Sequence, residues 1–341
     1  MHILVLPSFY PEDFKKNKGI FFKDQVRALS NWVSKINVIY LEQRTLREFS
    51  FIGLKKSYFQ YEILEENKWD EYRIKGWKMP TIIGDYIWVF KTVRLIDKYI
   101  KLNGKPDIIH VHNVFFAGLV ANKIRKKYNI PYIVTEHDSA FLMDNHSKRK
   151  VKVASKIYKN ASKVVSVSNS LKSVLEGIVP KLEVQVIPNI VNPLFFKLSN
   201  KLNNQSKKTK FISIGNLNEN KGHLLLIEAF SLVCKNNNVS LIICGEGKER
   251  DRILSKIDEL QLKGKVSLLG HLKPTKIYDK LITSDCLVHS SFFETFGVVL
   301  IEALSTGIPF ISTKCGGPED IYEEEFGYMV EKGDVKGISE A

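Results

Sequence analysis

Two carboxylates stand close together in an otherwise apolar segment of the chain. The segment, residues 292–307, reads FFETFGVVLIEALSTG, and its acids are Glu294 and Glu302. Burying an unpaired carboxylate is costly, so each acid needs a protein cation or ligand groups that complete its hydrogen bonds. The hydroxyls of a sugar or a ribose are suitable donors. Two interpretations of Glu302 therefore stand side by side: an acid that binds a ligand, or an acid paired with an Arg or Lys of a neighbouring helix.

A helix is predicted to begin between the two acids. The residues GVVLIEAL, 297–304, have helical length and are followed by Gly307, a common terminator. The free N–H groups and the dipole at a helix start favour an anion such as phosphate, and Gly297 lets a ligand approach the backbone closely. Glu302 lies about 7–8 Å along the helix from this start, at ~1.5 Å per residue. The spacing predicts a diphosphate at the helix start, with one acid on either side.

The elements that position these residues follow from the hydrophobic pattern. Short β-branched runs alternate with segments of helical length, which predicts parallel sheets covered by helices on both faces. Such sheets bind ligands at the carboxyl ends of their strands. Strands are predicted within residues 2–8, 35–42, 106–113, 131–137, 164–170, 183–189, 211–217, 240–247, 266–271, 285–291, 309–315 and 327–334.

The length of the chain, 341 residues, predicts two domains. A polar, basic stretch at 197–210 has no apolar periodicity and is typical of a linker. We therefore expect an α/β architecture with a Rossmann-like domain over 1–196, a linker over 197–210 and a second Rossmann-like domain over 211–341. The strand ends of the two domains are expected to face each other across a cleft. The sequence stops where a helix is starting, so the second domain is expected to be truncated at its end.

The pair of acids, with Thr-Phe-Gly after the first, resembles the signature of the retaining family 4 glycosyltransferases. These enzymes have the GT-B fold, in which two doubly wound domains face each other across a cleft. The acceptor binds mainly to the first domain and the nucleotide sugar to the second. Further segments resemble the family in the same order, namely residues 18–29, 110–121, 134–141, 186–192, 212–230 and 241–253.

The resemblance implies a role for each matching residue. Glu294 is expected to bind hydroxyls of the donor sugar, Glu302 the ribose, and Lys221 the departing diphosphate. His137 is expected to contact the sugar near the reacting carbon, and Gly19 to let a loop of the first domain close over the phosphates. The implied catalytic residues are Glu294, Lys221 and His137, and the implied donor-binding residues are Gly19, Gly215, Asn216, Lys221, Gly245, Glu246, Glu294, Thr295, Phe296, Gly297, Val298 and Glu302.

The implied activity is a retaining, metal-independent transfer of a sugar from a nucleotide donor, UDP-linked rather than GDP-linked, to a hydroxyl acceptor. Assembly of a surface polysaccharide or glycolipid is the expected setting, with no cofactor. One residue departs from the pattern: Asn216 stands where the family usually has an Arg, whose bidentate phosphate contact Asn cannot supply. Two alternatives stay open, a nucleotide-sugar 2-epimerase and a non-catalytic partner in a glycosylation complex. Apart from the resemblance, an ordinary histidine at a strand end is the preferred interpretation of His137.

The charge is concentrated in the first part of the chain. The net charge is +14, and residues 1–200 hold 33 Lys+Arg against 18 Asp+Glu. Either this surface is simply well solvated, or an anion lies nearby, such as a lipid headgroup or a phosphorylated carrier.

Residues 47–90 are rich in aromatics and Lys, which fits a lipid interface or a helix core. No nucleic-acid motif accompanies the basic runs, so we expect no nucleic-acid partner. We expect a cytoplasmic protein with peripheral contact to an anionic membrane, because no signal peptide or long apolar run is seen.

Other motifs carry less weight. His110 and His112 lie two residues apart on a predicted strand and share a face, but a metal site lacks a third ligand near them. The GEGKER turn, 245–250, lacks the third glycine of a dinucleotide fingerprint. The four cysteines form no C-x-x-C pair and are expected to be reduced. No metal site is therefore expected.

Overall fold

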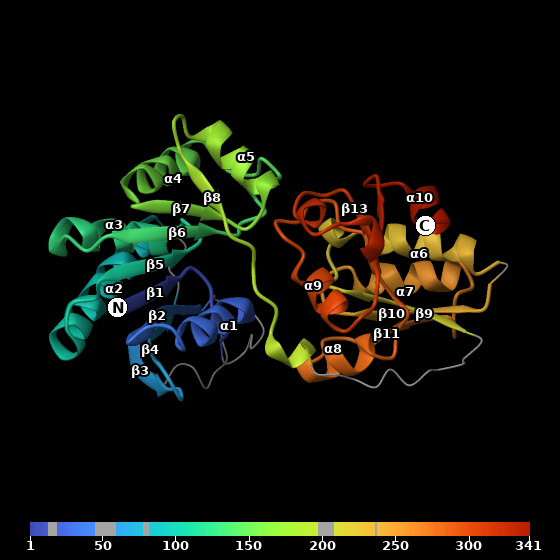
Figure 1. Ribbon diagram of the computed structural model, residues 1–341, viewed down its shortest axis with the longest axis horizontal. Helices are drawn as coiled ribbons and strands as arrows, with labels where there is room; N and C mark the ends of the chain where they lie inside the picture. The colour runs from blue at the N-terminus through green and yellow to red at the C-terminus, as the bar shows by residue number, and fades with distance from the viewer. Residues whose placement is uncertain (13–18, 45–58, 78–81, 197–207, 236) are drawn as a thin grey trace. The chain divides into compact units, whose positions relative to one another are not determined.

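A computed structural model describes residues 1–12, 19–44, 59–77, 82–196, 208–235 and 237–341. The chain divides into two compact units: residues 1–167 with 172–188, and residues 168–171 with 189–341. Figure 1 shows one sheet with its helices in each unit. Most of the predicted linker, 197–210, lies outside the described residues, so the predicted domain limits stay a prediction.

The first unit is built on a sheet of eight strands in the order β3-β4-β2-β1-β5-β6-β7-β8. All described neighbours are parallel except the pair β3 and β4, which is antiparallel. The elements are β1 (His2–Pro7), α1 (Ile20–Leu29), β2 (Lys35–Arg44), β3 (Phe59–Glu65), β4 (Asp70–Trp77), α2 (Ile82–Asn103), β5 (Ile108–His112), α3 (Ala117–Tyr128), β6 (Tyr132–Glu136), α4 (Lys148–Asn160), β7 (Lys163–Ser166), α5 (Asn169–Ile178) and β8 (Val184–Val186). The first three residues of α5 are grouped with the second unit.

The pair β3 and β4 differs from the sequence prediction. From the sequence, residues 47–90 fit a lipid interface or a helix core. The described part forms these two strands and the start of α2, so only α2 contributes a helix core, and the lipid interface stays a prediction. The sequence of β4 does not show the alternation of apolar and polar residues expected of a strand, because its charged residues are buried. The Arg73 guanidinium donates to Glu71 at 2.5 Å, and Lys75 forms an ion pair with Glu62 at 2.6 Å. Burial of charged residues that are paired hides the usual alternation of apolar and polar residues.

The strands of the first sheet place alternate residues on opposite faces. Ile3 and Val5 of β1 pack with Phe22 and Val26 of α1. On β2, Asn37 lies on the other face, where its side-chain amide donates to the Tyr99 hydroxyl of α2 at 3.1 Å. Both faces are therefore covered, as the continuous apolar strands predict.

The second unit is built on a sheet of six parallel strands in the order β11-β10-β9-β12-β13-β14. Every strand predicted for this half is present. The elements are η3 (Pro193–Phe196), β9 (Thr209–Ile214), η4 (Glu219–Lys221), α6 (His223–Val233), β10 (Val239–Cys244), α7 (Arg250–Glu259), β11 (Val266–Leu268), α8 (Pro274–Leu281), β12 (Cys286–His289), α9 (Val298–Ser305), β13 (Phe310–Thr313), η5 (Pro318–Asp320), η6 (Glu324–Phe326), β14 (Gly327–Val330) and α10 (Val335–Glu340).

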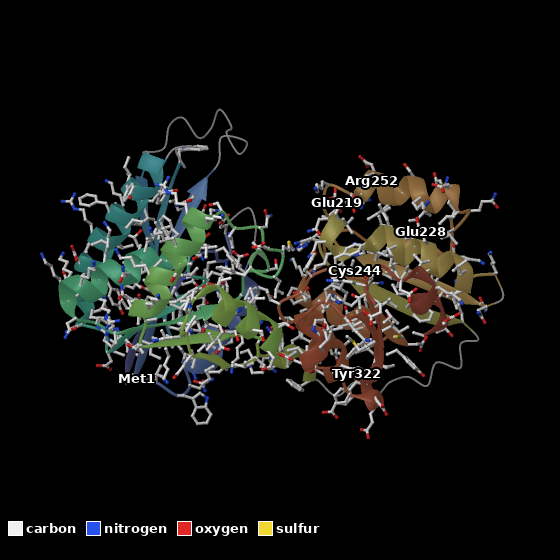
Figure 2. The ribbon with its side chains drawn as sticks, turned by 90° about the horizontal axis from the view of Figure 1, so that it is seen from above. Met1, Glu219, Glu228, Cys244, Arg252 and Tyr322 are labelled. Carbon is white, nitrogen blue, oxygen red and sulfur yellow. The ribbon has the colours of Figure 1, made fainter. Side chains whose placement is uncertain are left out.

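Helices cover both faces of the second sheet. Residues of α6, α7 and α10 pack on one face, where Leu241 of β10 is buried. Residues of α8 and α9 pack on the other face, around Leu287 of β12. Figure 2 labels Cys244, which is buried within this unit, and Glu228 of α6, whose carboxylate lies 3.3 Å from Lys256 of α7. All four cysteines are free thiols.

Each unit has a doubly wound α/β fold, as predicted. The order of the second sheet reverses between β9 and β12, which places the loops after these strands at a switch point of the topology. Among the described residues, no helix is long and apolar enough to cross a membrane.

The packing of the loops after β9 and β10 generates a prediction about folding. A Cβ added at Gly245 would lie 1.8 Å from the backbone oxygen of Gly215, whereas a Cβ at Gly215 would lie 3.4 Å from the flexible Lys221 side chain. Gly245→Ala is therefore expected to destabilise the second unit by at least about 1–3 kcal/mol, the usual cost of overpacking. Gly215→Ala is the matched control and should fold normally.

Thermal unfolding followed by far-UV circular dichroism measures this difference. The four tryptophans, Trp32, Trp69, Trp77 and Trp88, all belong to the first unit, so their fluorescence reports separately on that unit. Equal melting temperatures for the two alanine variants would contradict the packing described.

Candidate functional site

The start of α9 has the geometry predicted for an anion site. Gly297 precedes the helix with φ 92° and ψ 55°, a left-handed conformation that favours glycine. No side chain caps the helix, and the first N–H groups of a helix have no acceptor within it. Phe296 is buried just before this point, and Thr295 is buried beside it. The backbone from Thr295 to Val298 therefore forms a loop and helix start that can present N–H groups to an anion.

Glu294 lies in the loop between β12 and α9, and its backbone is fixed on both sides. Its N–H donates to the carbonyl of Cys315 at 2.9 Å, and its carbonyl accepts from the N–H of Gly317 at 2.7 Å. Gly317 packs so tightly that an added Cβ would lie 2.2 Å from the Cα of Phe296. The loop after β13 thus fixes the backbone of Glu294 just before the start of α9.

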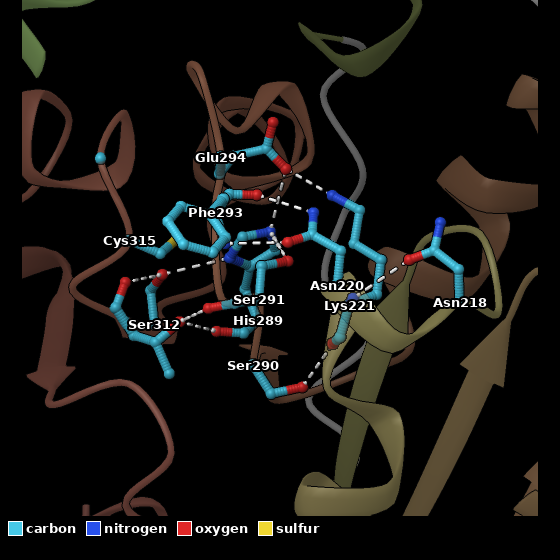
Figure 3. Close-up of polar contacts among 12 residues, drawn as sticks. Asn218, Asn220, Lys221, His289, Ser290, Ser291, Phe293, Glu294, Ser312 and Cys315 are labelled. Atoms are coloured by element: carbon cyan, nitrogen blue, oxygen red, sulfur yellow. Dashed lines mark hydrogen bonds and ion pairs between the residues drawn. The ribbon is translucent and has the colours of Figure 1, made fainter. Parts of the chain in front are cut away.

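An asparagine joins this loop to the loop after β9. The Asn220 side-chain amide donates to the carbonyl of Phe293 at 2.9 Å and accepts from the N–H of the same residue at 3.0 Å (Figure 3). The Asn220 carbonyl also accepts from the N–H of Phe292 at 2.8 Å. Because Lys221 follows Asn220 and Glu294 follows Phe293, these bonds bring the two predicted catalytic residues together.

Lys221 and Glu294 form an ion pair, drawn as a dashed line in the upper part of Figure 3. Their side chains are 21% and 18% exposed. Burial alone would raise the pKa of Glu294, but the charge of Lys221 and a hydrogen bond from His289 outweigh it and hold that pKa well below its usual range. The carboxylate therefore stays ionised, and it neutralises the lysine that is predicted to meet a diphosphate.

His289, at the end of β12, stands behind this ion pair. Its Nε2 lies 3.5 Å from the Glu294 carboxylate and 3.1 Å from the Ser291 hydroxyl, and its Nδ1 lies 3.3 Å from the Ser312 hydroxyl. Burial lowers the pKa of His289, which favours the neutral imidazole. The sequence analysis missed His289 and Asn220. The polar HSS run at a strand end was the available signal for His289, because such ends line ligand sites in parallel sheets.

The other predicted donor-binding residues of this unit fall into two groups. Gly215 lies beside the Lys221 side chain, at the carboxyl end of β9. Gly245 packs against the carbonyl of Gly215, while Asn216 is exposed. Glu246 is half-exposed and its carboxylate lies 3.4 Å from Arg250 on the following helix. The structure thus joins Gly215 and Gly245 to the Lys221 loop and leaves Glu246 at a surface turn.

Glu302 is half-buried on α9, where Leu300 and Ala303 face the core. The segment is therefore less enclosed than its composition indicates, and the cost of placing an acid there is correspondingly smaller. Its role toward a ribose stays a prediction.

Two predicted site residues belong to the first unit. Gly19 precedes α1 in a left-handed conformation with φ 68°, and an added Cβ would lie 3.0 Å from the Phe9 carbonyl oxygen. His137 is buried directly after β6, where its N–H donates to the Asn113 side chain at 3.0 Å. Each sits at the carboxyl end of the first sheet, the edge at which ligands of doubly wound folds bind.

His137 is part of a histidine cluster. The rings of His110 and His112 lie 4.2 Å apart, which confirms that they share one face of β5, and the His137 ring lies 5.4 Å from that of His112. His112 Nδ1 lies 3.2 Å from His137 Nε2. Burial lowers the pKa of His110 to about 4 and that of His137 to about 3. Within the described ranges, no group of side chains has the composition of a metal site.

Glu136 is a buried acid that the sequence analysis did not single out. It is 0% exposed, and its carboxylate accepts from the N–H of Val114 at 3.0 Å and from the Tyr158 hydroxyl at 2.7 Å. It also accepts from the N–H groups of His137 and Asp138, both at 3.0 Å. Burial raises its pKa to about 7. Glu136 therefore ties together the loops that follow β5 and β6.

The histidine cluster predicts loss of stability in acid. Burial holds the pKa of His112 well below the ordinary histidine value of 6.5, so the unfolded chain binds a proton below pH 6.5 that the folded chain does not. Stability is therefore present above pH 6.5 and is lost as pH falls below it. His112→Gln should make the free energy of unfolding less dependent on pH, by up to about 1.4 kcal/mol per pH unit between pH 6.5 and 5.

Urea unfolding followed by tryptophan fluorescence measures this slope in the first unit. An identical slope for the variant and the unaltered protein would show that His112 takes up its proton equally well in the folded state.

The hydrogen bonds of Asn220 predict a graded effect on the second unit. Asn220→Ala removes two bonds to Phe293 and should destabilise the unit by about 1–3 kcal/mol. Asn220→Asp keeps one acceptor but cannot donate to the Phe293 carbonyl, and should fall between the alanine variant and the unaltered protein. Melting followed by circular dichroism gives the order, and no destabilisation in either variant would contradict the proposed clamp.

The chain matches two families of known proteins. Residues 195–341 match the family Glycosyl transferases group 1, and residues 60–194 match Glycosyltransferase Family 4. The two matches together span residues 60–341.

Relatives and solved structures agree with these matches. An uncharacterised glycosyltransferase of Methanocaldococcus jannaschii is 31% identical over 69% of this chain and 63% of its own length, so the chain spans less than two thirds of that relative. TuaC of Bacillus subtilis, a glycosyltransferase assigned to teichuronic acid biosynthesis, is 24% identical over 100% of this chain and 88% of its own. The crystal structure of Anabaena HepE with UDP and glucose superposes with a TM-score of 0.75 and 19% identity, over 100% of this chain and 88% of that one.

Proposed function

Because the chain belongs to the group 1 glycosyltransferases of the GT-B fold, we propose that it moves a sugar from a nucleotide-sugar donor to a hydroxyl acceptor. The observation that carries this proposal is the Lys221–Glu294 ion pair at the start of α9. A cation, a helix start and an ionised acid meet there, and these are the groups needed to bind a sugar diphosphate. The second unit is the proposed holder of the donor.

The ion pair exchanges partners when the donor binds. The diphosphate takes the Lys221 ammonium and the N–H groups at the start of α9, because it carries more negative charge than a carboxylate. Glu294, released from Lys221, accepts hydrogen bonds from hydroxyls of the donor sugar, and His289 keeps it in place from behind. Glu302 holds the ribose. Arg is absent from position 216, so Lys221 carries the cationic contact.

The chemistry follows from where charge develops. Cleavage of the glycosidic bond to the diphosphate builds positive charge on the sugar ring and negative charge on the leaving oxygen. Lys221 and the helix start stabilise the leaving group in the transition state more than in the ground state. These fixed charges do the work that a divalent cation does in other transferases, so we propose a metal-independent reaction. The acceptor hydroxyl attacks from the face that the diphosphate leaves and gives its proton to the departing diphosphate oxygen, which retains the anomeric configuration.

UDP is the proposed nucleotide, supported by the fold shared with HepE, whose structure contains UDP and glucose. Surface polysaccharide or glycolipid assembly is the proposed setting, supported by the similarity to TuaC. The basic first unit is proposed to face an anionic acceptor at the cytoplasmic side of a membrane. His137 and Gly19 are proposed to contact the donor from the first unit.

Site variants test the roles of the two acids. Glu294→Gln should lower donor turnover at least about 100-fold, as loss of a strong transition-state contact does, with the donor Kd changed less than about threefold. Glu302→Gln should instead weaken donor binding about tenfold at similar turnover. Nucleotide release from UDP-sugars, with and without acceptor, gives turnover, and calorimetry gives Kd.

A matched control is the exposed pair of Lys314 and Glu331, joined at 2.5 Å in the same unit. Glu331→Gln makes the same chemical change away from the start of α9 and should leave turnover unaltered. Unchanged turnover in Glu294→Gln, or an equal loss in the control, would refute the assignment of Glu294. If a full panel of nucleotide sugars neither binds nor turns over, the proposed function fails.

A further inference from the structure

The first unit contains a cavity of about 790 Å³ that the proposed donor site does not use. It opens at the carboxyl ends of β1 and β2 and is also lined by the loops that follow β5 and β6. This is the edge of a doubly wound sheet where ligands bind, and the volume suits a small molecule and not a macromolecule. Asp138 lines it, one residue after His137.

One side of the cavity is apolar and aromatic. Phe115, Phe116 and Leu119 line it from the loop after β5 and from α3, and Tyr86 and Val89 line it from α2. Tyr86 is 64% exposed although it is a large aromatic residue. An exposed aromatic side chain beside a cavity is well suited to cover an apolar ligand that extends out of it.

Another side is cationic. Lys123 of α3 and Arg149 and Lys150 of α4 line the cavity, and the Lys150 Nζ lies 5.6 Å from the centre of the Phe115 ring. None of the three forms an ion pair with a carboxylate among the described residues. Lys148, Arg149 and Lys150 occupy the first turn of α4, which contains no acid. Cations at a helix start oppose the helix dipole, so this arrangement is unfavourable until an anion binds.

A buried histidine gives independent support for a ligand. The His146 side chain is 8% exposed, lines the cavity and lies 3.1 Å from the Asp138 carboxylate through Nε2. Its ring packs against Phe115 and Phe141, with centroids 4.7 and 4.5 Å away. Its Nδ1 has no hydrogen-bond partner in the part of the chain that the structure describes. A buried nitrogen without a partner is costly, and a bound ligand that supplies one would remove that cost.

Three acids also line the cavity and indicate the orientation of the ligand. Glu12 accepts from the Tyr40 hydroxyl at 2.5 Å, Asp138 faces His146, and Asp85 is exposed on α2. Carboxylates repel a phosphate but accept hydrogen bonds from hydroxyls. The phosphate end of a ligand is therefore expected beside Arg149 and Lys150, and its sugar hydroxyls beside Asp138.

We propose that this cavity binds the acceptor, and that the acceptor is a lipid-linked phosphate: an apolar chain joined through a phosphate or diphosphate to the group that is glycosylated. This inference rests on the proposed function, since it names the acceptor class of the same reaction. A free phosphate ester would leave the aromatic side bare, and a neutral glycolipid would leave the three cations without a partner. Only a ligand with both parts uses both sides.

Isothermal titration with soluble probes tests the ligand class. Octyl phosphate, octyl glucoside and inorganic phosphate are each titrated below the concentration at which they form micelles. Octyl phosphate is expected to bind at least tenfold more tightly than either of the others. If inorganic phosphate binds as tightly as octyl phosphate, the acceptor is a soluble phosphate ester, and if octyl glucoside does, the cations play no part. Either result overturns the proposal.

Two double variants on the same helix locate the site. Arg149→Glu with Lys150→Glu reverses two charges that line the cavity, and Lys148→Glu with Lys152→Glu reverses two exposed charges of α4 that do not. Both pairs change the net charge of the chain by the same amount. The first pair is expected to weaken octyl phosphate binding at least tenfold, and the second less than twofold. An equal loss in both would mean a diffuse electrostatic effect and would overturn the proposal.

Donor hydrolysis is measured on the same preparations, so that the two proposals fail separately. The cavity variants are expected to release nucleotide from the donor in water at the unaltered rate, with circular dichroism as a check of folding. Normal donor hydrolysis without octyl phosphate binding would remove only the acceptor inference. Absence of donor binding in the unaltered protein would remove the proposed function itself.

Discussion

The ion pair between Lys221 and Glu294 is the interaction on which the account of the second unit depends. Each residue stabilises the charge of the other, because a partly buried ammonium or carboxylate is favoured by a nearby counter-charge. The pair exists because the bonds of Asn220 to Phe293 join the loops after β9 and β12. These loops lie at the reversal of strand order, so the fold itself places a cation and an anion beside a helix start. The same charges that stabilise each other in the free protein are those that a sugar diphosphate needs.

The first unit depends on a different kind of constraint. Buried ionisable groups lie at the carboxyl edge of its sheet. Burial lowers the pKa of His112 and His137, which favours neutral imidazoles, and raises the pKa of Glu136 to about 7. Glu136 accepts from the backbone on both sides of the cluster and so fixes the loops that present Phe115 and Asp138 to the cavity. This buried polar cluster thus connects two loops that contribute residues to the cavity. We propose that the second unit binds the diphosphate and that the first unit binds the acceptor.

Much of this arrangement could be predicted from the sequence, and the limits have physical causes. The apolar parallel strands, the start of α9 at Gly297 and the pairing of His110 with His112 on one face follow from local periodicity, which the sequence carries directly. The strands β3 and β4 were missed because Glu71 and Arg73 are buried as an ion pair, which reverses the usual meaning of charge. His289 was missed although the polar run at its strand end was a local signal. Asn220 was missed because its role is set by hydrogen bonds between distant loops; Asn220 and Phe293 are 73 residues apart. No local pattern records such a contact.

The central claim is that a diphosphate and Glu294 compete for Lys221, and a titration with UDP tests it most directly. UDP lacks the transferred sugar, so Glu294 gains no new hydrogen-bond partner from the ligand when it releases Lys221. Glu294→Gln frees the lysine and should therefore bind UDP more tightly than the unaltered protein, by about threefold or more, while Lys221→Met should bind it at least tenfold more weakly. If Glu294→Gln binds UDP with the same or lower affinity, Lys221 does not change partners, and the account of the site is wrong.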